Sequence, residues 1–359
     1  MKSRVYFVPV KEKYGRVKTG EAFKLLMEKS GIFDMLEGGR AVIKMHFGEE
    51  GNTGFIDPFY VRLLVDELAK NGMSACLADT NTLYKGRRTD PDEHAALAAE
   101  HGFTFDNTGA HVIIPDESEP DCSKEIPVHG EHITTAKIAD LFFRYDLLVD
   151  LAHFKGHLMT GFGGAIKNLG MGCAVREGKL EQHTDLTPEI FEEKCTGCAR
   201  CVDVCPAGAI ALEGGKAVMD RGKCIGCADC IAVCPTEAMN VRWEHGADNI
   251  QEKMAEYAEA VLGGLKGRAI HINFAVKITK ECDCLAKDDP RICPDIGLLV
   301  STDPVSLDKA CLDLVIGKSG RDIFREVHPD RDGMKQLIHA QKRGLGSMNY
   351  ELIDLTGEK

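Results

Sequence analysis

One segment of the chain repeats itself, and the spacing of its cysteines permits few folds. The run CTGCARCVDVCPAGAIAL begins at Cys195 and aligns with CIGCADCIAVCPTEAMNV, which begins at Cys224; both have the form C-x2-C-x2-C-x3-C-P. Three thiolates on one tight loop, with a fourth on the helical turn that follows, suit a cubic iron–sulfur cluster. The sequence therefore predicts a bacterial-type ferredoxin module with two 4Fe–4S clusters.

The cysteines of this repeat fall into two sets, because in two-cluster modules the fourth cysteine of each half crosses to the other cluster. One cluster is expected on Cys195, Cys198, Cys201 and Cys234. The other is expected on Cys224, Cys227, Cys230 and Cys205. Structural zinc is the competing interpretation of any C-x2-C pair. The doubled spacing and the proline after each fourth cysteine disfavour zinc.

The rest of the composition indicates a reducing compartment. Fifteen cysteines would suggest disulfides in a small secreted protein, but this chain has 359 residues, and its start shows no signal-peptide cleavage site. No apolar run reaches the roughly 18–20 residues of a membrane-spanning helix. The net charge of −12 disfavours nucleic acid or an anionic membrane as a partner. We therefore expect a cytoplasmic protein whose clustered cysteines bind metal.

On both sides of the cysteine segment, short β-rich runs alternate with amphipathic stretches. The expected strands are Val5–Val10, Arg40–Phe47, Ser74–Asp79, His111–Asp116, Asp146–Ala152, Ala269–Ile278 and Gly297–Ser301. The expected helices are Glu21–Leu36 capped by Thr19, one from Asp57 to Lys70, one starting at Asp90, Asn249–Leu262 and Asp303–Val315. This alternation predicts an α/β fold with a mainly parallel sheet.

The cysteine segment is expected to be an insertion, because the α/β pattern resumes after it. Residues 1–186 would form the first part of the α/β domain, and residues 246–359 its second part. Residues 187–245 would form the inserted α+β ferredoxin-like module with its two clusters.

The most informative stretch outside this module is DLAHFKGHLMTGFGGAIKNLGMGCA, which begins at Asp150. Residues just past the carboxyl end of a strand line the ligand crevice of open α/β sheets. The glycine-rich turn into a helix is expected to offer free backbone amides to an anionic ligand. The catalytic candidates are His153, Lys155, His157 and Lys167, and the binding candidates are Gly161, Gly163, Gly164 and Asn168. The alternative is a glycine-rich turn with solvated histidine and lysine side chains.

Polar residues also follow two earlier strands. Lys44 and His46 lie at the end of one strand, and Asp79 and Asn81 close the next. If neighbouring parallel strands carry them, these residues converge on one cleft. His183 precedes the ferredoxin insertion and is expected to line the passage between cleft and clusters.

A second group of cysteines comprises Cys282, Cys284 and Cys293, in ITKECDCLAKDDPRICPDIG. Cys282 and Cys284 are candidate ligands of a zinc, an iron or a corner of an additional cluster. The competing interpretation is a pair of reduced thiols in a polar loop. Cys76 and Cys311 are expected in the core. Cys173 lies beside the glycine turn, and its role is left open.

Further motifs accompany the double repeat: KMHFGEEGNTG, LADTNTLYKGRR, HFKGHLMTGFGGAIKNLGMGCA, CDC and PDIGLLVSTDPVSLDKACLDLV. Together they resemble the iron–sulfur proteins of the "domain of unknown function 362" family over nearly the whole chain. The resemblance implies the clusters and the fold, and it leaves the reaction open. The run from His157 to Lys167 is also similar to a stretch of the nickel-pincer lactate racemase family, with Gly156 replacing a proline and Gly163 a serine. That similarity implies an acid/base role for His157 and a cofactor or substrate anchor at Lys167.

Three functions remain open. The leading hypothesis is an oxidoreductase, in which the clusters exchange electrons with a small anionic ligand or organic cofactor in the cleft. His153 and His157 would supply protons, and Lys155 and Lys167 would stabilise negative charge. The second is an electron carrier that docks to a larger redox partner protein, and the third is a protein that handles metal or clusters.

Overall fold

The computed structural model describes residues 2–11, 15–183, 188–241 and 249–357. Its centre is an eight-stranded sheet in the order β16-β1-β15-β14-β7-β2-β3-β4. The strands are β1 Ser3–Pro9, β2 Gly39–Lys44, β3 Met73–Ala78, β4 His111–Ile113, β7 Leu147–His153, β14 Ala269–Ala275, β15 Gly297–Ser301 and β16 Tyr350–Asp354. Only β15 runs antiparallel to its neighbours, β1 and β14, among the described strands of this sheet. The predicted α/β fold with a mainly parallel sheet is confirmed.

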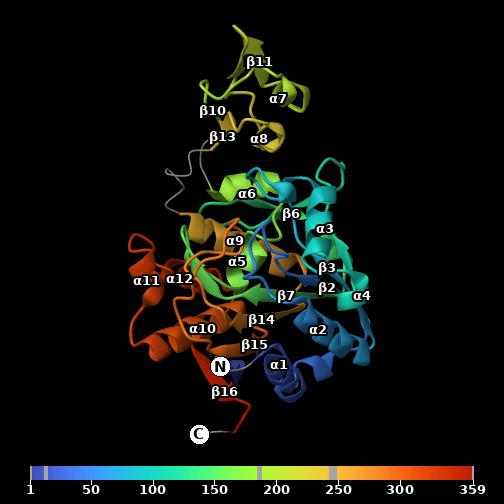
Figure 1. Cartoon of the computed structure of the whole chain (residues 1–359), viewed down its shortest axis with the longest axis vertical. Coiled ribbons are helices and arrows are strands. Elements are labelled where there is room, and N and C mark those ends of the chain that lie inside the picture. The colour runs from blue at the N-terminus through green and yellow to red at the C-terminus, as the bar shows by residue number, and fades with distance from the viewer. Residues whose placement is uncertain (1, 12–14, 184–187, 242–248, 358–359) are drawn as a thin grey trace.

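Helices cover both faces of this sheet (Figure 1). One layer holds α1 Arg16–Ser30, α2 Pro58–Lys70, α3 Pro91–Glu100 and α4 Phe105–Thr108. The other holds α5 Ala165–Gly170, α6 Arg176–His183, α9 Ile250–Gly264, α10 Pro304–Ser319, α11 Ile323–Val327 and α12 Met334–Lys342. Every residue of β7 is buried. Leu148 and Val149, two consecutive residues of this strand, belong to the two hydrophobic cores on opposite faces of the sheet. The run LLVDLA is apolar because both faces of this strand are covered.

Three helices start where their sequence signals predicted. Asp57, Asp90 and Asp303 each cap a helix with the side-chain carboxylate, and a proline occupies the first helical turn of each. The prediction for the first helix was wrong, because α1 begins at Arg16 without a side-chain cap and Thr19 lies buried inside it. The helix ends at Gly31, which adopts φ = 67°. That left-handed conformation favours glycine and stops the helix before Leu36.

Three predicted strands are shorter in the structure. β2 ends at Lys44 rather than Phe47, β4 ends at Ile113 rather than Asp116, and β14 ends at Ala275 rather than Ile278. Lys277 has φ = 53°, a conformation that breaks the extended chain and turns it into the loop that follows β14.

Several elements carried too weak a pattern to be predicted. They include the hairpins β5 Ser123–Pro127 with β6 Thr135–Ala139 and β8 Lys155–His157 with β9 Gly161–Gly163. Short 3-10 turns lie at Phe33–Met35, Arg87–Thr89 and Asp140–Arg144.

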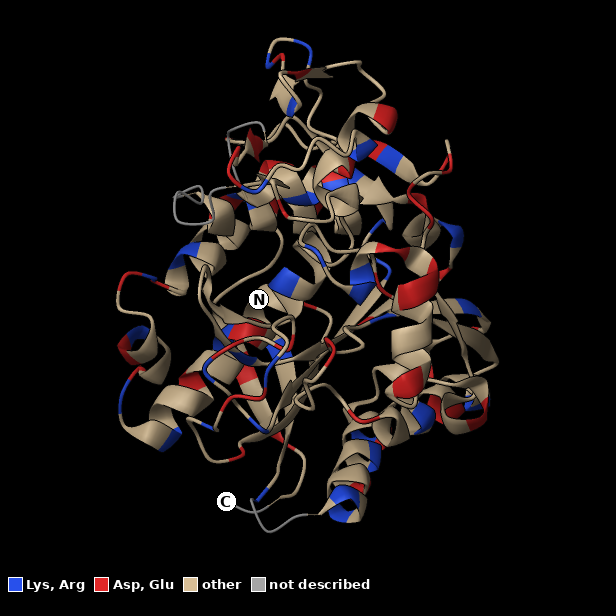
Figure 2. Ribbon diagram, turned by 45° about the horizontal axis from the view of Figure 1, so that its top comes forward, with Lys and Arg blue, Asp and Glu red and all other residues tan. Residues whose placement is uncertain are grey.

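Basic and acidic residues are mixed over the described ribbon (Figure 2).

The cysteine-rich segment forms a small lobe beside α6 (Figure 1). Its elements are β10 Glu189–Ile190, α7 Arg200–Asp203, β11 Ile210–Glu213, β12 Lys216–Met219, α8 Asp229–Val233 and β13 Met239–Asn240. Strands β14, β15 and β16, which follow this lobe in sequence, join the same sheet as β1, β2, β3 and β7, which precede it. The predicted domain boundaries at 186/187 and 245/246 lie outside the described residues. No described helix has the length and apolarity that crossing a membrane would require.

Candidate functional site

A cavity of about 120 Å³ opens at the carboxyl ends of the neighbouring strands β7, β2 and β3. Thirteen of the predicted site residues line it: Lys44, His46, Asp79, His153, Lys155, His157, Gly163, Gly164, Lys167, Asn168, His183, Cys282 and Cys284. Two do not line it. Asn81 is buried and donates to the Pro115 carbonyl, and Gly161 packs against Gly333 with φ = 76°.

One wall of the cavity is built around a buried carboxylate, Asp283. His153 Nδ1 and Lys155 Nζ lie 2.8 and 2.9 Å from the same carboxylate oxygen of Asp283. His153 Nε2 lies 2.8 Å from the Val276 carbonyl, so both ring nitrogens face acceptors. Burial alone would raise the pKa of Asp283, but His153 and Lys155 hold it well below its ordinary value. Asp283 is therefore a buried anion that fixes two of the predicted catalytic side chains.

A second buried network joins the ends of β2, β3 and β7. Lys44 Nζ lies 2.8 Å from Asn168 Oδ1 and 3.1 Å from Asp79 Oδ1. Asn168 Nδ2 in turn donates to Asp150 Oδ1 over 2.6 Å. Burial raises the pKa of Asp79, but Lys44 and His46 overcome this effect and hold it below the ordinary value. Asn168 therefore positions the Lys44 cation between three strands.

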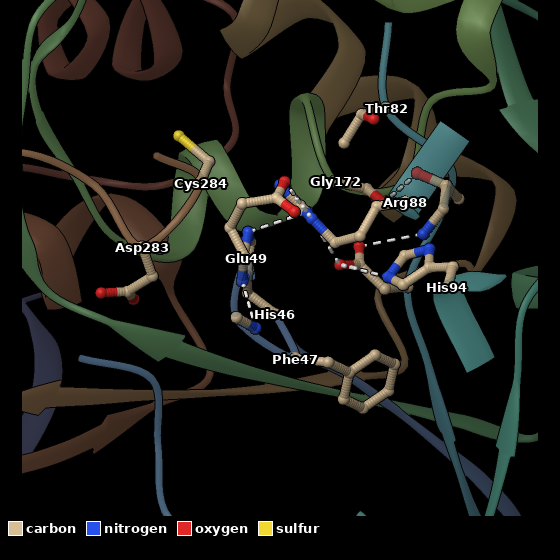
Figure 3. A network of polar contacts seen from close by, with 12 residues as sticks. His46, Phe47, Glu49, Thr82, Arg88, His94, Gly172, Asp283 and Cys284 are labelled. Carbon is tan, nitrogen blue, oxygen red and sulfur yellow. Dashed lines mark hydrogen bonds and ion pairs between the residues drawn. The ribbon is translucent and has the colours of Figure 1, made fainter. Parts of the chain in front are cut away.

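Arg88 organises the third part of the site (Figure 3). Its Nε donates to Glu49 Oε2 over 2.9 Å, and its Nη1 lies 2.9 Å from His46 Nε2. Arg88 also donates to the hydroxyl of Tyr84, which donates to the Cys284 carbonyl over 2.8 Å. Burial, with Arg88 beside it, lowers the pKa of His46 well below its ordinary value. His46 is therefore neutral near pH 7.

His157 presents a defined tautomer. Its Nδ1 accepts hydrogen bonds from the backbone N–H groups of Met159 and Thr160, at 3.2 and 3.3 Å. Burial, reinforced by Lys167, lowers the pKa of His157 well below 6.5. A neutral imidazole whose Nδ1 accepts must carry its hydrogen on Nε2. His157 is therefore a hydrogen-bond donor in the cavity wall.

The turn from β9 into α5 differs from its prediction. The first amides of α5, those of Ala165 and Ile166, donate to the Asp308 carboxylate over 2.8 and 3.0 Å. They are not free for a ligand, because the fold supplies its own anion there. A Cβ atom on Gly164 would lie 2.3 Å from Asp308 Oδ1, so this close approach requires glycine.

Cys282 and Cys284 lie in the cavity beside Lys167. Cys282 Sγ accepts from the Cys284 amide over 3.3 Å and lies 3.7 Å from Lys167 Nζ. Hydrogen bonding by Cys284 lowers the pKa of Cys282 against the effect of burial, and Lys167 adds to the lowering. The pKa of Cys284 is raised because the Cys284 thiol donates a hydrogen bond to the Cys282 sulfur. Together with His157, these cysteines place three potential ligand atoms within 4.8 Å of one another.

The described structure contains no second set of three or more histidine, cysteine or carboxylate ligands so close together. His157, Cys282 and Cys284 are thus a candidate metal site. The remaining cysteines of this group and the core lie apart from it. Cys293 packs near Ser319, and Cys76, Cys173 and Cys311 are buried in the larger core.

Helix α6 separates the cavity from the cysteine-rich lobe. Lys179 and His183 line the cavity, whereas Leu180 of the same helix packs into the lobe's core together with Leu83. Burial lowers the pKa of Lys179 to about 8 and that of His183 to about 4. Arg176, also on α6, holds the lobe through an ion pair with Asp229 over 3.0 Å.

Within the lobe, the two halves of the repeat adopt the same backbone. Gly197 and Gly226 have φ = 69° and 75°, and Ala199 and Ala228 have φ = 65° and 64°. A left-handed alanine is uncommon, and its occurrence at both equivalent positions indicates a conformation imposed by the loop. The repeat in sequence is therefore a repeat in structure.

The cysteines of the lobe line two separate small cavities. One is lined by Cys195, Cys198, Cys201 and Cys234, and the other by Cys205, Cys224, Cys227 and Cys230. Backbone amides of Ala217, Ala209 and Met239 donate to the sulfurs of Cys195, Cys205 and Cys234 over 3.2–3.4 Å. Four zinc-bound thiolates would place their sulfurs ~3.8 Å apart. No three of the lobe's described cysteines lie within 4.8 Å of one another, so their sulfurs are farther apart than zinc ligands.

Sequence reasoning missed several residues of the site. They are Asp283 and Tyr84 from loops, Arg88 from the 3-10 turn Arg87–Thr89, and Lys179 from α6, and none of them has a strand-end position. Asp283 lies between the two cysteines of CDC, and that position was the only local signal for it.

Another buried histidine, His94, makes a testable pH-dependent contribution to stability. Its side chain is fully buried, and burial lowers its pKa from 6.5 to about 3. The folded state therefore binds fewer protons than the unfolded chain between these values, and stability is lost as pH falls from 6.5 toward 3. Acidification from pH 6.5 to pH 5 is expected to cost about 2 kcal/mol through this group.

Urea unfolding of wild type and His94→Gln across this pH range measures the effect. The variant should show a shallower loss of stability, by up to about 1.4 kcal/mol per pH unit. The exposed His111 provides the control, because His111→Gln should keep the wild-type slope. Equal slopes for His94→Gln and wild type would contradict the prediction.

Comparison with known proteins places the chain. The family described as "Domain of unknown function (DUF362)" matches residues 41–313, a span that includes the cavity and the cysteine-rich lobe. The chain belongs to the DUF362 family. No protein of the curated set matches its sequence.

Solved structures are similar to this DUF362 protein at low identity. A crystal structure from Thermotoga maritima has 12% identity and a TM-score of 0.43, covering 87% of this chain and 61% of that one. The lactate racemase apoprotein from Thermoanaerobacterium thermosaccharolyticum has 14% identity and a TM-score of 0.41, covering 77% of this chain and 51% of that one. The chain thus spans between half and two thirds of the length of these proteins.

Proposed function

We propose that this DUF362 protein is a cytoplasmic iron–sulfur oxidoreductase whose two 4Fe–4S clusters exchange electrons with a small anionic ligand or cofactor in the cavity. The observation that carries the proposal is the position of α6. One helix contributes Lys179 and His183 to the cavity and Leu180 to the core of the cysteine-rich lobe. Electrons leaving the lobe through this contact reach the cavity within one helix diameter, about 10 Å.

The donor set of the lobe fits the clusters. Each small cavity offers four thiols, and backbone amides point at three of the sulfurs, as expected where they stabilise a negatively charged cluster. When bound, such clusters supply one-electron transfer at low potential. Cys198 is exposed, so the cluster that it would hold lies toward solvent, where a redox partner protein can dock.

The cavity residues supply charge and protons. Lys155 is paired with Asp283 and Lys44 with Asp79, whereas Lys179 donates to Thr80 and to the Asn81 carbonyl and forms no ion pair within 4.0 Å among the described residues. An anionic ligand would neutralise this excess of positive charge. The Nε2–H of neutral His157 can donate a hydrogen bond to that ligand. The proton for a group being reduced can come from the Lys179 ammonium, because burial lowers the pKa of Lys179 to about 8.

Anaerobic purification, metal analysis and mass spectrometry of the small molecules released on denaturation test the proposal. About eight irons per chain are expected, together with a bound organic species or a measurable affinity for small anions. His157→Ala and Lys167→Ala should weaken that affinity, whereas Lys309→Met, in an ion pair with Asp313 outside the cavity, should not. Eight irons with no ligand, and a stoichiometric oxidoreductase retained from the lysate, would instead favour an electron carrier.

A further prediction concerns the contact between lobe and cavity. Arg176→Gln removes the ion pair with Asp229 and should slow electron transfer from the lobe to the cavity, because Leu180 then holds the lobe against α6 without that ion pair. The iron content and the cluster spectra should stay unchanged. The matched control is Arg221→Gln, since Arg221 is exposed on the lobe and lies 3.9 Å from Glu189 of the same lobe. Stopped-flow absorbance at the cluster band measures the rate, and equal rates for both variants would contradict the prediction.

A further inference from the structure

Two thiols in the cavity lie within reach of each other and take no part in the cysteine-rich lobe. Cys282 and Cys284 follow β14 on a tight turn, closed by a hydrogen bond from the Leu285 amide to the Cys282 carbonyl over 3.1 Å. Their sulfurs lie within 4.8 Å of each other. A turn of this kind keeps the Cα atoms at a separation that a disulfide tolerates.

The two sulfurs have different surroundings. Cys282 Sγ accepts from the Cys284 amide and has Lys167 Nζ 3.7 Å away. Both contacts stabilise a thiolate at Cys282. A thiolate beside a cation, with a second thiol next to it, is the arrangement of a thiol–disulfide redox centre.

The turn that carries the pair is held rigidly. Asp283 stands between the two cysteines and is bound by His153 and Lys155. The hydroxyl of Tyr84 donates to the Cys284 carbonyl over 2.8 Å. The backbone of the turn therefore keeps the two sulfurs side by side.

We propose that Cys282 and Cys284 form a dithiol–disulfide couple that relays electrons in pairs between the lobe and the cavity ligand. This relay rests on the proposed function for its electrons. When the S–S bond breaks, the pair takes up two electrons, one from each cluster, and one proton. The products are a Cys282 thiolate beside Lys167 and a Cys284 thiol. When the bond re-forms, the same two electrons and proton pass to a two-electron acceptor in the cavity. Two one-electron donors thereby serve one two-electron acceptor.

The same sulfurs are candidate metal ligands, and two contacts favour the couple over a metal ion. The Lys167 ammonium lies 3.7 Å from Cys282 Sγ, and its charge would repel a metal cation bound to that sulfur. His157 uses Nδ1 to accept two backbone N–H groups, so its Nε2 carries hydrogen and offers no lone pair.

Differential alkylation of the intact, anaerobically purified protein tests the couple. The protein is equilibrated in dithiothreitol redox buffers, quenched in acid, denatured and labelled with N-ethylmaleimide. Trypsin should release residues 281–287, ECDCLAK, which contain both cysteines and no other. We expect this peptide to carry two labels in reducing buffers. In oxidising buffers it should carry none and be lighter by two hydrogens.

Cluster reduction supplies the second readout. Protein with an oxidised pair is treated with dithionite limited to two electrons per chain, and the peptide should regain two labels as the paramagnetic signals of two reduced clusters disappear. Lys167→Met removes the cation that stabilises the reduced pair, so its midpoint potential should fall. Lys309→Met should leave that potential unchanged.

The outcomes separate the two proposals. A peptide that takes two labels in every buffer, or a stoichiometric zinc or nickel ion released by modifying these thiols, overturns the couple and leaves the iron–sulfur function standing. A disulfide that forms reversibly but is not reduced by the clusters overturns the relay. Protein that contains neither iron nor cluster signals overturns the proposed function itself.

Discussion

Replacing Cys205 and Cys227 together should remove one cluster, whereas replacing Cys205 and Cys201 together should remove both. The reason is the crossing of the chain: Cys205 lines the same small cavity as Cys227, although it is closer in sequence to Cys201. Iron analysis should find about four irons per chain in C205A/C227A and almost none in C205A/C201A. If each half of the repeat instead held its own cluster, these two results would be exchanged.

The mirror pair strengthens this test. C234A/C198A should lose one cluster and C234A/C227A both, because Cys234 shares its cavity with Cys198. Electron paramagnetic resonance of the reduced protein counts the remaining clusters independently of iron analysis. Cys122→Ala is the control, since Cys122 lies outside both sets and should leave iron and signals unchanged. Loss of all iron in both single-cluster variants would contradict the assignment.

Asp283→Ala should be the most destabilising single substitution in the cavity wall. It removes the carboxylate that His153 and Lys155 share at 2.8 and 2.9 Å, and it leaves a buried lysine without its counter-ion. Breaking a buried pair in this way typically costs about 3–5 kcal/mol. Chemical denaturation at pH 7 measures the loss of stability.

Two further variants identify the cause. Asp288→Ala alters an exposed carboxylate of the same loop, which bonds Thr53, and should cost less than about 1 kcal/mol. Lys155→Met combined with Asp283→Ala should recover part of the lost stability, because no unpaired lysine remains. A loss below about 1 kcal/mol in Asp283→Ala would show that the charges are solvated and that the pair contributes little.

Much of the fold could be predicted because its signals are local. The helix starts at Asp57, Asp90 and Asp303 depend only on one capping side chain and the next helical turn, and all three starts were confirmed. The first helix had no such signal, because α1 starts without a side-chain cap, and its prediction failed. The short hairpins and β16 were not predicted, for a related reason. Segments of so few residues show no clear hydrophobic period.

Strand-end reasoning gathered much of the candidate site. Lys44, Asp79 and His153 lie at the ends of strands that the fold makes neighbours, so a parallel sheet suffices to bring them together. The same reasoning could not find Asp283 or Arg88. Each meets its partners across a long separation in sequence or through a loop, and no local pattern encodes such a contact.

The cysteine repeat shows most clearly what the sequence determines and what only the tertiary structure decides. The sequence by itself predicted two sets of four cysteines from their spacing, and these are the two sets that line the two small cavities of the lobe. Tertiary structure alone decided where the lobe docks, through Arg176 and Leu180 of α6. It also decided that the Asp308 carboxylate, and not a ligand, caps α5. Those contacts join residues far apart in the chain, and only the packing of the whole sheet and its helices brings them within hydrogen-bonding distance.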